Sequence, residues 1–537
     1  MQKKNNIIIG FHSGHDCSYC ILEDGVPVVH EEYERLSRIK EGQGDGLKFF
    51  FERNPSLLKT ASVFTHCHHV GGDETSVREL GDVSLFDKML KMAKDRGGNY
   101  FQIGHHTCHA AHAHYSSRFE NSIIISMDAG GWELLPNKES TAISSAVFRG
   151  KQNKINTVAV ADIQQLNVAE IWQQALSNLF GLSNGPPKGN QAGTIMAMAA
   201  IGKTAAFKDI CYDCFTKPAL FTEFIPEIKK YIEEDSQNKY SVSRGLQEAT
   251  EDMIRQVIQQ YIEPNDENLC FTGGVALNSV TMGKIKKWFP QIKDIFVPIV
   301  PYDGGLCIGA AQYIYHHIQN NPKLKNQEYF KPYLGVSYKK SDVQAALESR
   351  REKLLVRESD DKEVIDLLDD QKIVSIFNEK SESGRRALGN RSILADPRSD
   401  TMKDLINEKV KHRQWFRPFA PSILLEEVSN WFEYFVDSPY MGLVVPFKEE
   451  KRKEVPAVVH LDGTGRVQTV SKDINPWYHS FLQLWREKSG VPILLNTSFN
   501  DREPIVETPD NAINCFLNTD IDYLYFPEYG LLVSKND

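Results

Sequence analysis

The segment FQIGHHTCHAAHAHYSS, residues 101–117, carries five of the sixteen histidines in the 537-residue chain. The spacing predicts a helix over 105–115, which puts His105 and His109 one turn apart on one face, followed on that face by His112. Two imidazoles at this spacing can bind one metal ion. Histidine-rich helices also arise as solvated faces, so the spacing alone leaves both interpretations open.

A carboxylate from another element would favour the metal site. Asp128 follows the apolar run SIIISM and Asp303 lies in VPYDGG, so each sits where a strand is expected to give way to a glycine turn. Two histidines with one or two carboxylates suit Fe(II), Mn(II) or Zn(II) and leave coordination positions for a substrate. The alternative is that both aspartates only cap turns or helices.

These side chains need elements that bring them together. Residues 6–40 predict a strand, a loop and a further strand, with EDG as a hairpin turn. The run SIIISMDAGG predicts a strand that ends in an acid and glycines, and LCFTGGVALNSVTMGKI and DIFVPIVPYDGGLCIGAAQYIYHHI each predict a strand, a glycine turn and a helix. Such strand ends meet at the carboxyl edge of a sheet, where phosphates and a metal can be held. The amino-terminal part is therefore expected to be α/β.

Length and composition limit the class of protein. With 537 residues, 41% hydrophobic and 25% charged, the chain predicts an ordinary globular protein of two or more domains. The net charge of -9 disfavours non-specific binding to nucleic acid or anionic membranes. No apolar run reaches the roughly 18 residues of a membrane-spanning helix, and the amino-terminal residues fit a first strand better than a secretory signal. We therefore expect a cytoplasmic protein with no membrane partner.

The nine cysteines are an odd number scattered over a long chain, which favours free thiols in a reducing compartment. Two C-x-x-C pairs, Cys17/Cys20 and Cys211/Cys214, would suit zinc. The first pair lies in an apolar, strand-like run and the second lies far along the chain. Buried free cysteines are the expected state.

The apolar pattern weakens between residues 320 and 362, which indicates a domain junction. We expect domains at 1–340 and 341–537. Within this region a charged helix is expected in SDVQAALESRREKLLVRESDDKE. It is followed by the strand-like runs QKIVSIF, PSILL, MGLVVPF, VPILLNTSF and IDYLYF, separated by arginine-rich loops. The second domain is therefore expected to be mixed α/β.

Long motifs made of unlike residue types give the chain a specific resemblance. In the first half they are GFHSGHDCSYCILEDG, HHTCHAAHAHY, SMDAGG, FTGGVALNS and VPYDGGLCIGAA, and in the second SGRRALGNRSILADPRS, KHRQWFRPFAPSIL, LDGTGRVQTV and LLNTSFNDREPIVETP. In this order they resemble the NodU/CmcH-type O-carbamoyltransferases, a family that includes the tobramycin O-carbamoyltransferase. The motifs span nearly the whole chain, so chance agreement is improbable.

The resemblance implies a two-site enzyme. It implies a TsaD-like amino-terminal domain of the ASKHA class and a YrdC-like carboxy-terminal domain. In the family, the YrdC-like domain makes carbamoyl adenylate from ATP and carbamoyl phosphate, releasing phosphate and pyrophosphate. In the TsaD-like domain a substrate hydroxyl then attacks the carbonyl and AMP leaves. The family's iron ligands match His105, His109, Asp128 and Asp303, so Fe(II) is the metal that the resemblance implies, with Mg as a companion of ATP.

Forming an acyl adenylate brings anions together and needs fixed cations and hydrogen-bond donors. Residues that match the family's ATP and carbamoyl phosphate site are Arg386, Lys411, Arg417, Arg466, Asn496 and Ser498. For the transfer site, Gly273, Gly274 and Asn278 in TGGVALN would bring backbone amides and a polar side chain to the adenylate. His15 in SGHDCS matches a family active-site histidine, and an imidazole suits proton transfer from the attacking hydroxyl; His12 is expected to be structural.

The sequence departs from the family pattern in three places, at Thr194, at Lys40-Glu41 and at Glu379-Lys380. The first removes a lysine expected at a helix start, the second alters part of the acceptor site, and the third replaces a Gly-Arg pair. The motif THCHHV at 65–70 is a further histidine and cysteine cluster, with His66, Cys67, His68 and His69. On an extended segment alternate residues face opposite sides, so a metal site there is disfavoured, and the cluster could instead line the acceptor pocket.

Three functions remain open at this point. The first is O-carbamoylation of a small molecule, a sugar, or a hydroxymethylated nucleobase or nucleotide. The second is tRNA threonylcarbamoyl-type modification, which uses both domain types but is disfavoured by the acidic balance. The third is a non-catalytic sensor of metal and nucleotide, which fits poorly with four cationic positions in the adenylation motifs. A homodimer is compatible with the sequence.

Overall fold

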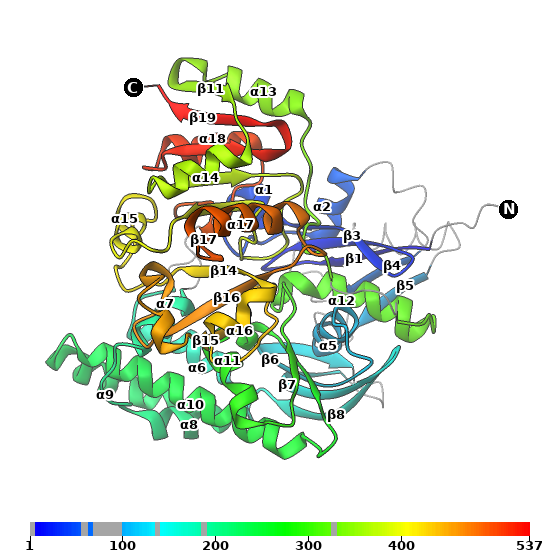
Figure 1. The fold of residues 1–537 in the computed structure, drawn as a ribbon. Coiled ribbons are helices and arrows are strands. Elements are labelled where there is room, and N and C mark those ends of the chain that lie inside the picture. Colours follow the sequence, from blue (N-terminus) through cyan, green and yellow to red (C-terminus); the bar gives the residue numbers. More distant parts are fainter. Residues whose placement is uncertain are drawn as a thin grey trace. The chain divides into compact units, whose positions relative to one another are not determined.

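The structure is a computed structural model that describes residues 6–54, 63–67, 99–134, 140–183, 191–323 and 330–536. The chain forms two compact units, Met1–Thr281 with Ile285–Phe330, and Met282–Lys284 with Lys331–Asp537. Figure 1 colours the chain from blue to red along the sequence. The predicted domain limits at 340 and 341 stay a prediction, because compactness alone does not show independent folding.

The first unit begins with a five-stranded sheet in the order β3-β2-β1-β4-β5. Its strands are β1 (Ile7–His12), β2 (Ser18–Glu23), β3 (Val26–Glu32), β4 (Val63–Cys67) and β5 (Asn99–Ile103). The predicted hairpin is confirmed, since β2 and β3 pair antiparallel around the EDG turn. Short helices α1 (Tyr33–Ser37) and α2 (Gly46–Arg53) lie between β3 and β4 in the chain, and Phe49 of α2 meets Tyr19 edge-on with ring centroids 5.0 Å apart.

Two helices pack on each other beside this sheet: α5 (His105–Ser116) and α12 (Leu306–Tyr313). Apolar residues of both helices share a buried cluster with Ile8 of β1 and Val63 of β4. Gly309 of α12 lies so close to α5 that a Cβ atom there would sit 1.8 Å from the Cys108 carbonyl oxygen. A glycine is needed at this crossing, and the close contact fixes α5 against the start of α12.

The second sheet of this unit has the order β10-β9-β6-β7-β8. Its strands are β6 (Asn121–Leu134), β7 (Ser140–Lys151), β8 (Lys154–Asp162), β9 (Asn268–Thr272) and β10 (Asp294–Phe296). The prediction that the first of these strands ends at Asp128 is wrong, because β6 runs on to Leu134. The pairing of β6 with β7 nevertheless shifts register between Met127 and Gly131, so Asp128 lies at an irregularity that frees its side chain from the regular alternation.

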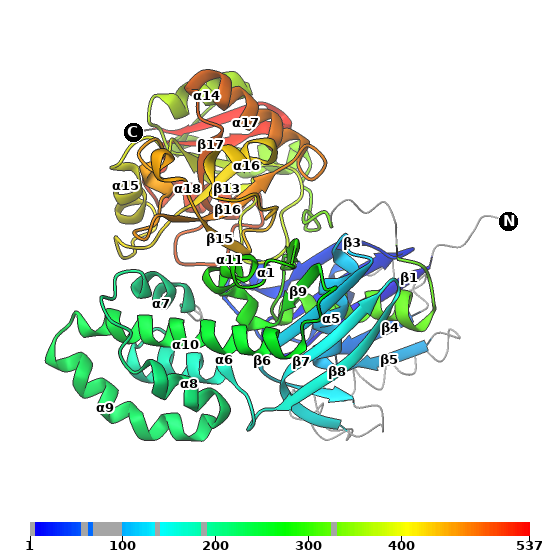
Figure 2. The ribbon, with the colours of Figure 1, turned by 60° about the horizontal axis from the view of Figure 1, so that its bottom comes forward.

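Helices connect β8 to β9, and Figure 2 shows three of them, α8, α9 and α10, lying together at one side of this unit. The connecting helices are α6 (Val168–Gln174), α7 (Ala192–Ala199), α8 (Lys208–Thr216), α9 (Phe221–Glu234) and α10 (Asn238–Tyr261). The helix α11 (Ser279–Trp288) comes directly after the TGGVALN turn. Within the described ranges, no helix is long and apolar enough to span a membrane.

The second unit is built on a nine-stranded mixed sheet in the order β11-β19-β18-β12-β13-β17-β14-β16-β15. Its strands are β11 (Leu354–Glu358), β12 (Val374–Phe377), β13 (Arg391–Ala395), β14 (Ala420–Leu424), β15 (Leu443–Pro446), β16 (Thr464–Val470), β17 (Ile493–Ser498), β18 (Tyr523–Phe526) and β19 (Leu531–Lys535). The helices are α13 (Lys340–Glu348), α14 (Asp361–Asp369), α15 (Met402–Lys409), α16 (Val428–Trp431), α17 (Pro476–Ser489) and α18 (Pro509–Leu517). Trp485 of α17 is fully buried in the core cluster against this sheet.

The expected α/β class is confirmed by these sheets and helices. All five strands expected in the second half are present, as β12, β14, β15, β17 and β18. The single charged helix expected after the domain junction is wrong: α13 ends at Glu348 and the residues LLVRE form β11. This strand lies at the end of the sheet and pairs with β19. Four of its five residues are exposed, Leu355 and Val356 among them, so the sequence lacks the alternation of a half-buried strand.

Candidate functional site

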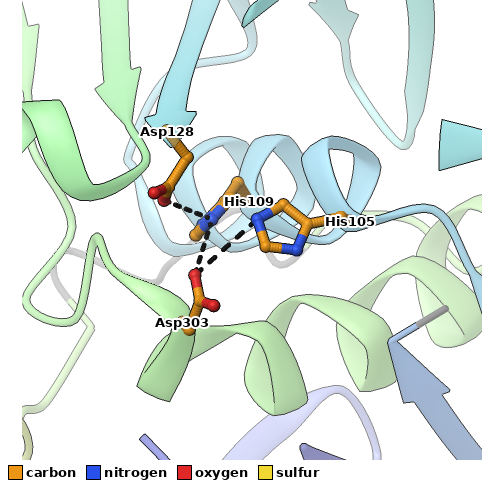
Figure 3. Close-up of side chains that lie close together, drawn as sticks. All are labelled: His105, His109, Asp128 and Asp303. Carbon is orange, nitrogen blue, oxygen red and sulfur yellow. Dashed lines mark ion pairs between the residues drawn. The ribbon is translucent and has the colours of Figure 1, made fainter. Parts of the chain in front are cut away.

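Four side chains of the first unit converge on one point (Figure 3). They are His105 and His109 of α5, Asp128 of β6 and Asp303 just before α12, and each offers a ligand atom within 4.8 Å of the others. His109 Nε2 lies 3.3 Å from Asp128 Oδ2 and 3.5 Å from Asp303 Oδ1, and His105 Nε2 lies 3.6 Å from Asp303 Oδ1. No other group of three or more potential metal ligands occurs among the described residues.

The helix that carries both histidines is fixed at its first turn by Glu133 of β6. The Glu133 carboxylate accepts hydrogen bonds from the Thr107 backbone N–H (3.1 Å) and from the Thr107 hydroxyl (2.6 Å). These bonds satisfy donors that a helix start leaves unpaired, and the negative charge suits the helix dipole. Gly104 leaves room for this carboxylate, because a Cβ atom there would lie 1.8 Å from Glu133 Oε1 and would force the side chain to move.

Backbone amides hold the Asp128 carboxylate in place. Oδ1 accepts from the Ala129 N–H (2.7 Å) and Oδ2 from the Gly274 N–H (2.7 Å). Gly273 adopts φ +85, and a Cβ atom there would lie 2.1 Å from the Met127 carbonyl oxygen. The glycine pair thus brings its turn against β6, and in this structure the Gly274 amide points to the aspartate.

Asn278, expected to face the adenylate, is engaged within the protein. Its Oδ1 accepts from the Thr281 N–H as the cap of α11 (3.1 Å), and its Nδ2 donates to Gln247 Oε1 (2.9 Å). Asn278 is 7% exposed. The structure therefore gives this side chain a capping function, and a contact with the adenylate stays a prediction.

The charges at the four-residue cluster suit a cation. Burial alone would lower the pKa of His109, but hydrogen bonding and attraction to Asp128 and Asp303 outweigh burial and raise it to about 9. Burial also opposes ionisation of the two aspartates, yet the surrounding histidines hold the pKa of Asp303 well below its usual range and lower that of Asp128. Two ionised carboxylates facing two imidazoles form a donor set that fits a divalent transition metal.

His15 lies at the mouth of this cluster. Its side chain is 64% exposed, and its Nε2 is 3.4 Å from Asp303 Oδ2 while its Nδ1 is 3.2 Å from Asp16 Oδ2. The hydrogen bond to Asp16 raises the His15 pKa against the opposing effect of burial, with the charge of Asp303 adding to the rise. His15 is thus the exposed imidazole of the site, and its part in proton transfer stays a prediction.

His12 lies closer to the cluster than the sequence indicated. It is fully buried at the end of β1, with its Nε2 3.0 Å from the His15 carbonyl oxygen and 3.9 Å from Asp303 Oδ2. The expectation of a structural histidine fits the first contact, since His12 holds the backbone of the His15 loop. The second contact was missed, although His12 and His15 stand three residues apart in the sequence.

Two other histidines of α5, His106 and His114, point into the core and away from the four-residue cluster. His106 lies against Ser126 Oγ (2.8 Å) and the Ile143 carbonyl (3.0 Å), and His114 lies against Ser122 Oγ (2.9 Å) and the Gln152 carbonyl (2.9 Å). Burial lowers the pKa of each to about 3, so both are neutral core residues. Two of the five histidines on this helix point to the cluster, and α5 is not a solvated face.

The second unit gathers arginines. Burial, followed by the charges of Arg386, Arg413 and Arg417, holds the pKa of Arg466 on β16 well below its usual range. Burial likewise lowers the pKa of Arg417. In the part of the chain that the structure describes, no carboxylate forms an ion pair with Arg413, Arg417 or Arg466. Three neighbouring guanidinium ions without a carboxylate partner have a charge that suits a polyanion.

Asn407 of α15 fixes two of these arginines, and the sequence revealed neither Asn407 nor Arg413. Asn407 Oδ1 accepts from Arg413 Nε (2.7 Å), and Asn407 Nδ2 donates to the carbonyls of Arg417 (3.0 Å) and Trp415 (3.3 Å). Its own carbonyl accepts from the Arg413 N–H (3.0 Å). The signal that could have located Arg413 is its place between Lys411 and Arg417 in the motif KHRQWFRPF.

The other predicted phosphate contacts are engaged in holding the loop after β17. The Lys411 ammonium, 4% exposed, donates to the carbonyl and to Oδ1 of Asn500, each at 2.7 Å, and to Ser498. The Ser498 hydroxyl donates to Asn500 Oδ1 (2.8 Å), and Asn496 Nδ2 donates to Gln468 Oε1 (2.8 Å). Contact of these three side chains with phosphate stays a prediction.

The departures from the family pattern lie at defined places. Thr194 is buried in the first turn of α7, and its hydroxyl has no hydrogen-bond partner among the described residues. The Glu41 backbone N–H donates to Glu34 Oε2 (3.0 Å), and the Glu379 carbonyl accepts from the buried Arg391 (3.1 Å). The side chains of the 66–69 cluster fall outside the described residues, as do His68 and His69 altogether. The expectation of buried free thiols is confirmed for the eight described cysteines.

Comparison with known proteins identifies the family. The family model for the carbamoyltransferase N-terminus matches residues 74–312 and the model for the carbamoyltransferase C-terminus matches residues 365–533. The nodulation protein NolO of Bradyrhizobium diazoefficiens is 31% identical over 448 residues, which cover 79% of this chain and 77% of that protein. The chain belongs to the carbamoyltransferase family. The resemblance found in the sequence and the expectation of a carbamoyltransferase enzyme are therefore confirmed.

Further similarities extend over other lengths. The nodulation protein NolNO of Sinorhizobium fredii is 34% identical over 80% of this chain, but the match spans only 63% of that protein. An uncharacterized protein of Methanocaldococcus jannaschii is 28% identical over 98% of this chain and 100% of its own length. Among solved structures, HypF of T. kodakarensis shares 14% identity over 60% of this chain and 48% of its own, with a TM-score of 0.38. The activator of 2-hydroxyisocaproyl-CoA dehydratase from Clostridium difficile shares 14% identity over 58% of this chain and 96% of its own, with a TM-score of 0.34.

Proposed function

We propose that this carbamoyltransferase is an ATP-dependent O-carbamoyltransferase that works through carbamoyl adenylate. The observation that carries the proposal is the half-buried group of Arg386, Arg413, Arg417 and Arg466, three of which, Arg413, Arg417 and Arg466, lack carboxylate partners in the described chain. Bringing ATP together with a second phosphate compound requires such fixed positive charge. The second unit is thus proposed as the activating site.

In the activating step, carbamoyl phosphate and water yield carbamate and phosphate. A carbamate oxygen then attacks the α-phosphorus of ATP, and pyrophosphate leaves with the electron pair of the broken P–O bond. Arg417 and Arg466 bind phosphate oxygens and stabilise the charge that moves onto the leaving group. Lys411 holds the loop after β17 through Ser498 and Asn500, and Mg accompanies the nucleotide.

In the transfer step, a hydroxyl of the acceptor attacks the carbonyl carbon of carbamoyl adenylate and AMP leaves. His15, the exposed histidine at the mouth of the cluster, accepts the hydroxyl proton in its neutral form. Because Asp16 and Asp303 raise its pKa, this form becomes more abundant as the pH rises. His105, His109, Asp128 and Asp303 fit a divalent ion, Fe(II) or otherwise Mn(II) or Zn(II), and when bound such an ion supplies positive charge for a reacting oxygen. The acceptor is proposed to be a small molecule, sugar or hydroxymethylated nucleobase, and not bulk nucleic acid, because the net charge is -9.

The experiment that tests this function omits the acceptor. Purified protein is incubated with ATP and carbamoyl phosphate, and pyrophosphate and AMP are followed. We expect pyrophosphate release that requires carbamoyl phosphate and is abolished in Arg417→Ala. The matched control is Arg398→Ala, an arginine of the same unit paired with Asp369 (2.6 Å) and Asp396 (2.7 Å), which keeps the activity if the variant stays folded. Bound ATP without any pyrophosphate release would contradict the proposal and favour the sensor.

A further inference from the structure

Trp415 stands out on the surface of the second unit. It is 57% exposed, the largest exposed fraction among the large hydrophobic residues that the structure describes. Leaving an indole in water sacrifices the free energy that its burial would give, which for a large apolar side chain is a substantial part of the stability of a domain. An exposed tryptophan in a fixed position is therefore a candidate for contact with a ligand.

Hydrogen bonds to the backbone and a ring contact fix the position of Trp415. Asn407, 1% exposed, donates to the Trp415 carbonyl (3.3 Å) and to the Arg417 carbonyl (3.0 Å). The neighbouring Phe416 is buried, and its ring meets the Trp415 ring edge-on with centroids 5.8 Å apart. The turn that carries the indole is thus already ordered by hydrogen bonds, so little further conformational entropy is lost when a ligand binds.

The flanking residues define the chemistry of the ligand. Arg413 and Arg417 stand two residues before and two residues after Trp415, and both belong to the group of guanidinium ions that acts on Arg466. Their backbone or side-chain atoms bond to the same Asn407 that holds the tryptophan. A ligand that uses all of this turn carries several negative charges and a flat apolar group.

A nucleoside triphosphate has this combination of groups. We propose that Trp415 is the base-stacking residue of the arginine site: its indole covers the face of the nucleobase while Arg413 and Arg417 bind the phosphates. The inference rests on the proposed function, which puts ATP at this site. Stacking reads the face of a base and not its edge, so this contact contributes affinity for any nucleobase.

The test compares a ligand with a base and one without. Binding of ATP and of inorganic tripolyphosphate is measured by calorimetry on the full chain, for the wild type, Trp415→Ala and Trp415→Phe. We expect Trp415→Ala to bind ATP about 5- to 150-fold more weakly, the range for loss of one base stack, while its affinity for tripolyphosphate is unchanged. Trp415→Phe restores most of the loss. The control is Phe435→Ala, an aromatic residue of the same unit that is 46% exposed, which leaves both affinities unchanged.

Other outcomes overturn the inference and separate it from the proposed function. Unchanged ATP binding in Trp415→Ala overturns it, as does an equal loss for ATP and tripolyphosphate, which would mean a general disturbance of the turn. A change of oligomeric state in Trp415→Ala with intact ATP binding would assign the indole to contacts between copies of the chain. If the wild type binds neither ligand, the proposed function itself fails, and the inference fails with it.

Discussion

Replacing Arg466 by methionine should raise the stability of the ligand-free protein and lower its affinity for ATP. Arg466 is half-buried on β16, and burial together with Arg386, Arg413 and Arg417 holds its pKa well below the usual range. Its Nε is buried and makes no hydrogen bond to any residue that the structure describes. Methionine fills a similar volume without charge, and such replacements of buried charged groups are often neutral or stabilising.

The magnitude follows from these two features. A buried donor without a partner costs about 1–3 kcal/mol, which Arg466→Met recovers. For a unit of about 150–250 residues, 1 kcal/mol shifts the melting temperature by about 2–4 °C, so the transition of the second unit should rise by about 2–12 °C. In the other direction, a hydrogen bond to a charged group is worth about 1.5–3 kcal/mol, so ATP binding should weaken about 10- to 150-fold.

The assay is thermal melting of wild type and Arg466→Met without ligand, with calorimetry of ATP binding in parallel. Arg398→Met is the matched control, because the same change there removes a guanidinium paired with Asp369 and Asp396. The control should melt at a lower temperature and bind ATP normally. If Arg466→Met instead melts at a lower temperature, the guanidinium stabilises the free fold, and the interpretation of an uncompensated anion site is refuted.

Three further predictions concern single side chains. His109→Ala should reduce bound metal from about one ion per chain to nearly none after loading with Fe(II) or Zn(II), measured by elemental analysis, and unchanged metal content would remove His109 from the ligands. Asn407→Ala should raise KM for ATP much more than it lowers kcat in the pyrophosphate assay, because it releases Arg413 and Arg417 from their shared support; a change in kcat alone would contradict this positioning role. Burial lowers the pKa of His30 to about 4, so the buried neutral imidazole carries no pH-dependent penalty above the unfolded pKa near 6.5. Below that pH the protein loses folding free energy through His30, until the pH reaches about 4. His30→Gln should remove about 2 kcal/mol of the loss between pH 7 and pH 5, as measured by denaturant unfolding, and an unchanged pH slope would show that His30 is not buried neutral.

Local patterns in the sequence predicted those parts of the fold and the site that depend only on local geometry. The four-residue spacing of His105 and His109 is a property of one helix, so it could be predicted before any tertiary contact was known. The hairpin turn and most strands of the second unit were likewise predictable from short apolar runs. The convergence of Asp128 and Asp303 on the helix depends on segments that are distant in the sequence. The strand pattern made both aspartates candidates, and the family resemblance implied that they join the two histidines.

The missed residues act through contacts that leave no periodic signal. Glu133 lies in a strand, yet its carboxylate caps a helix that begins earlier in the chain. Asn407 is one polar residue on a short helix, and its importance lies in bonds to a turn that follows it. Strand β11 was taken for part of a helix because four of its five residues are exposed, which replaces the alternation that a half-buried strand would show.

The Asp303 carboxylate contacts both the buried histidines of the cluster and the exposed His15. One oxygen faces the buried nitrogens of His105 and His109, and the other faces the exposed His15. In the proposed mechanism, a relative that altered this aspartate to change its metal preference would also change the proton affinity of His15. Natural drift or laboratory evolution at this position should therefore proceed by paired substitutions, one beside the ion and one at the mouth, and single substitutions should be rare among active descendants.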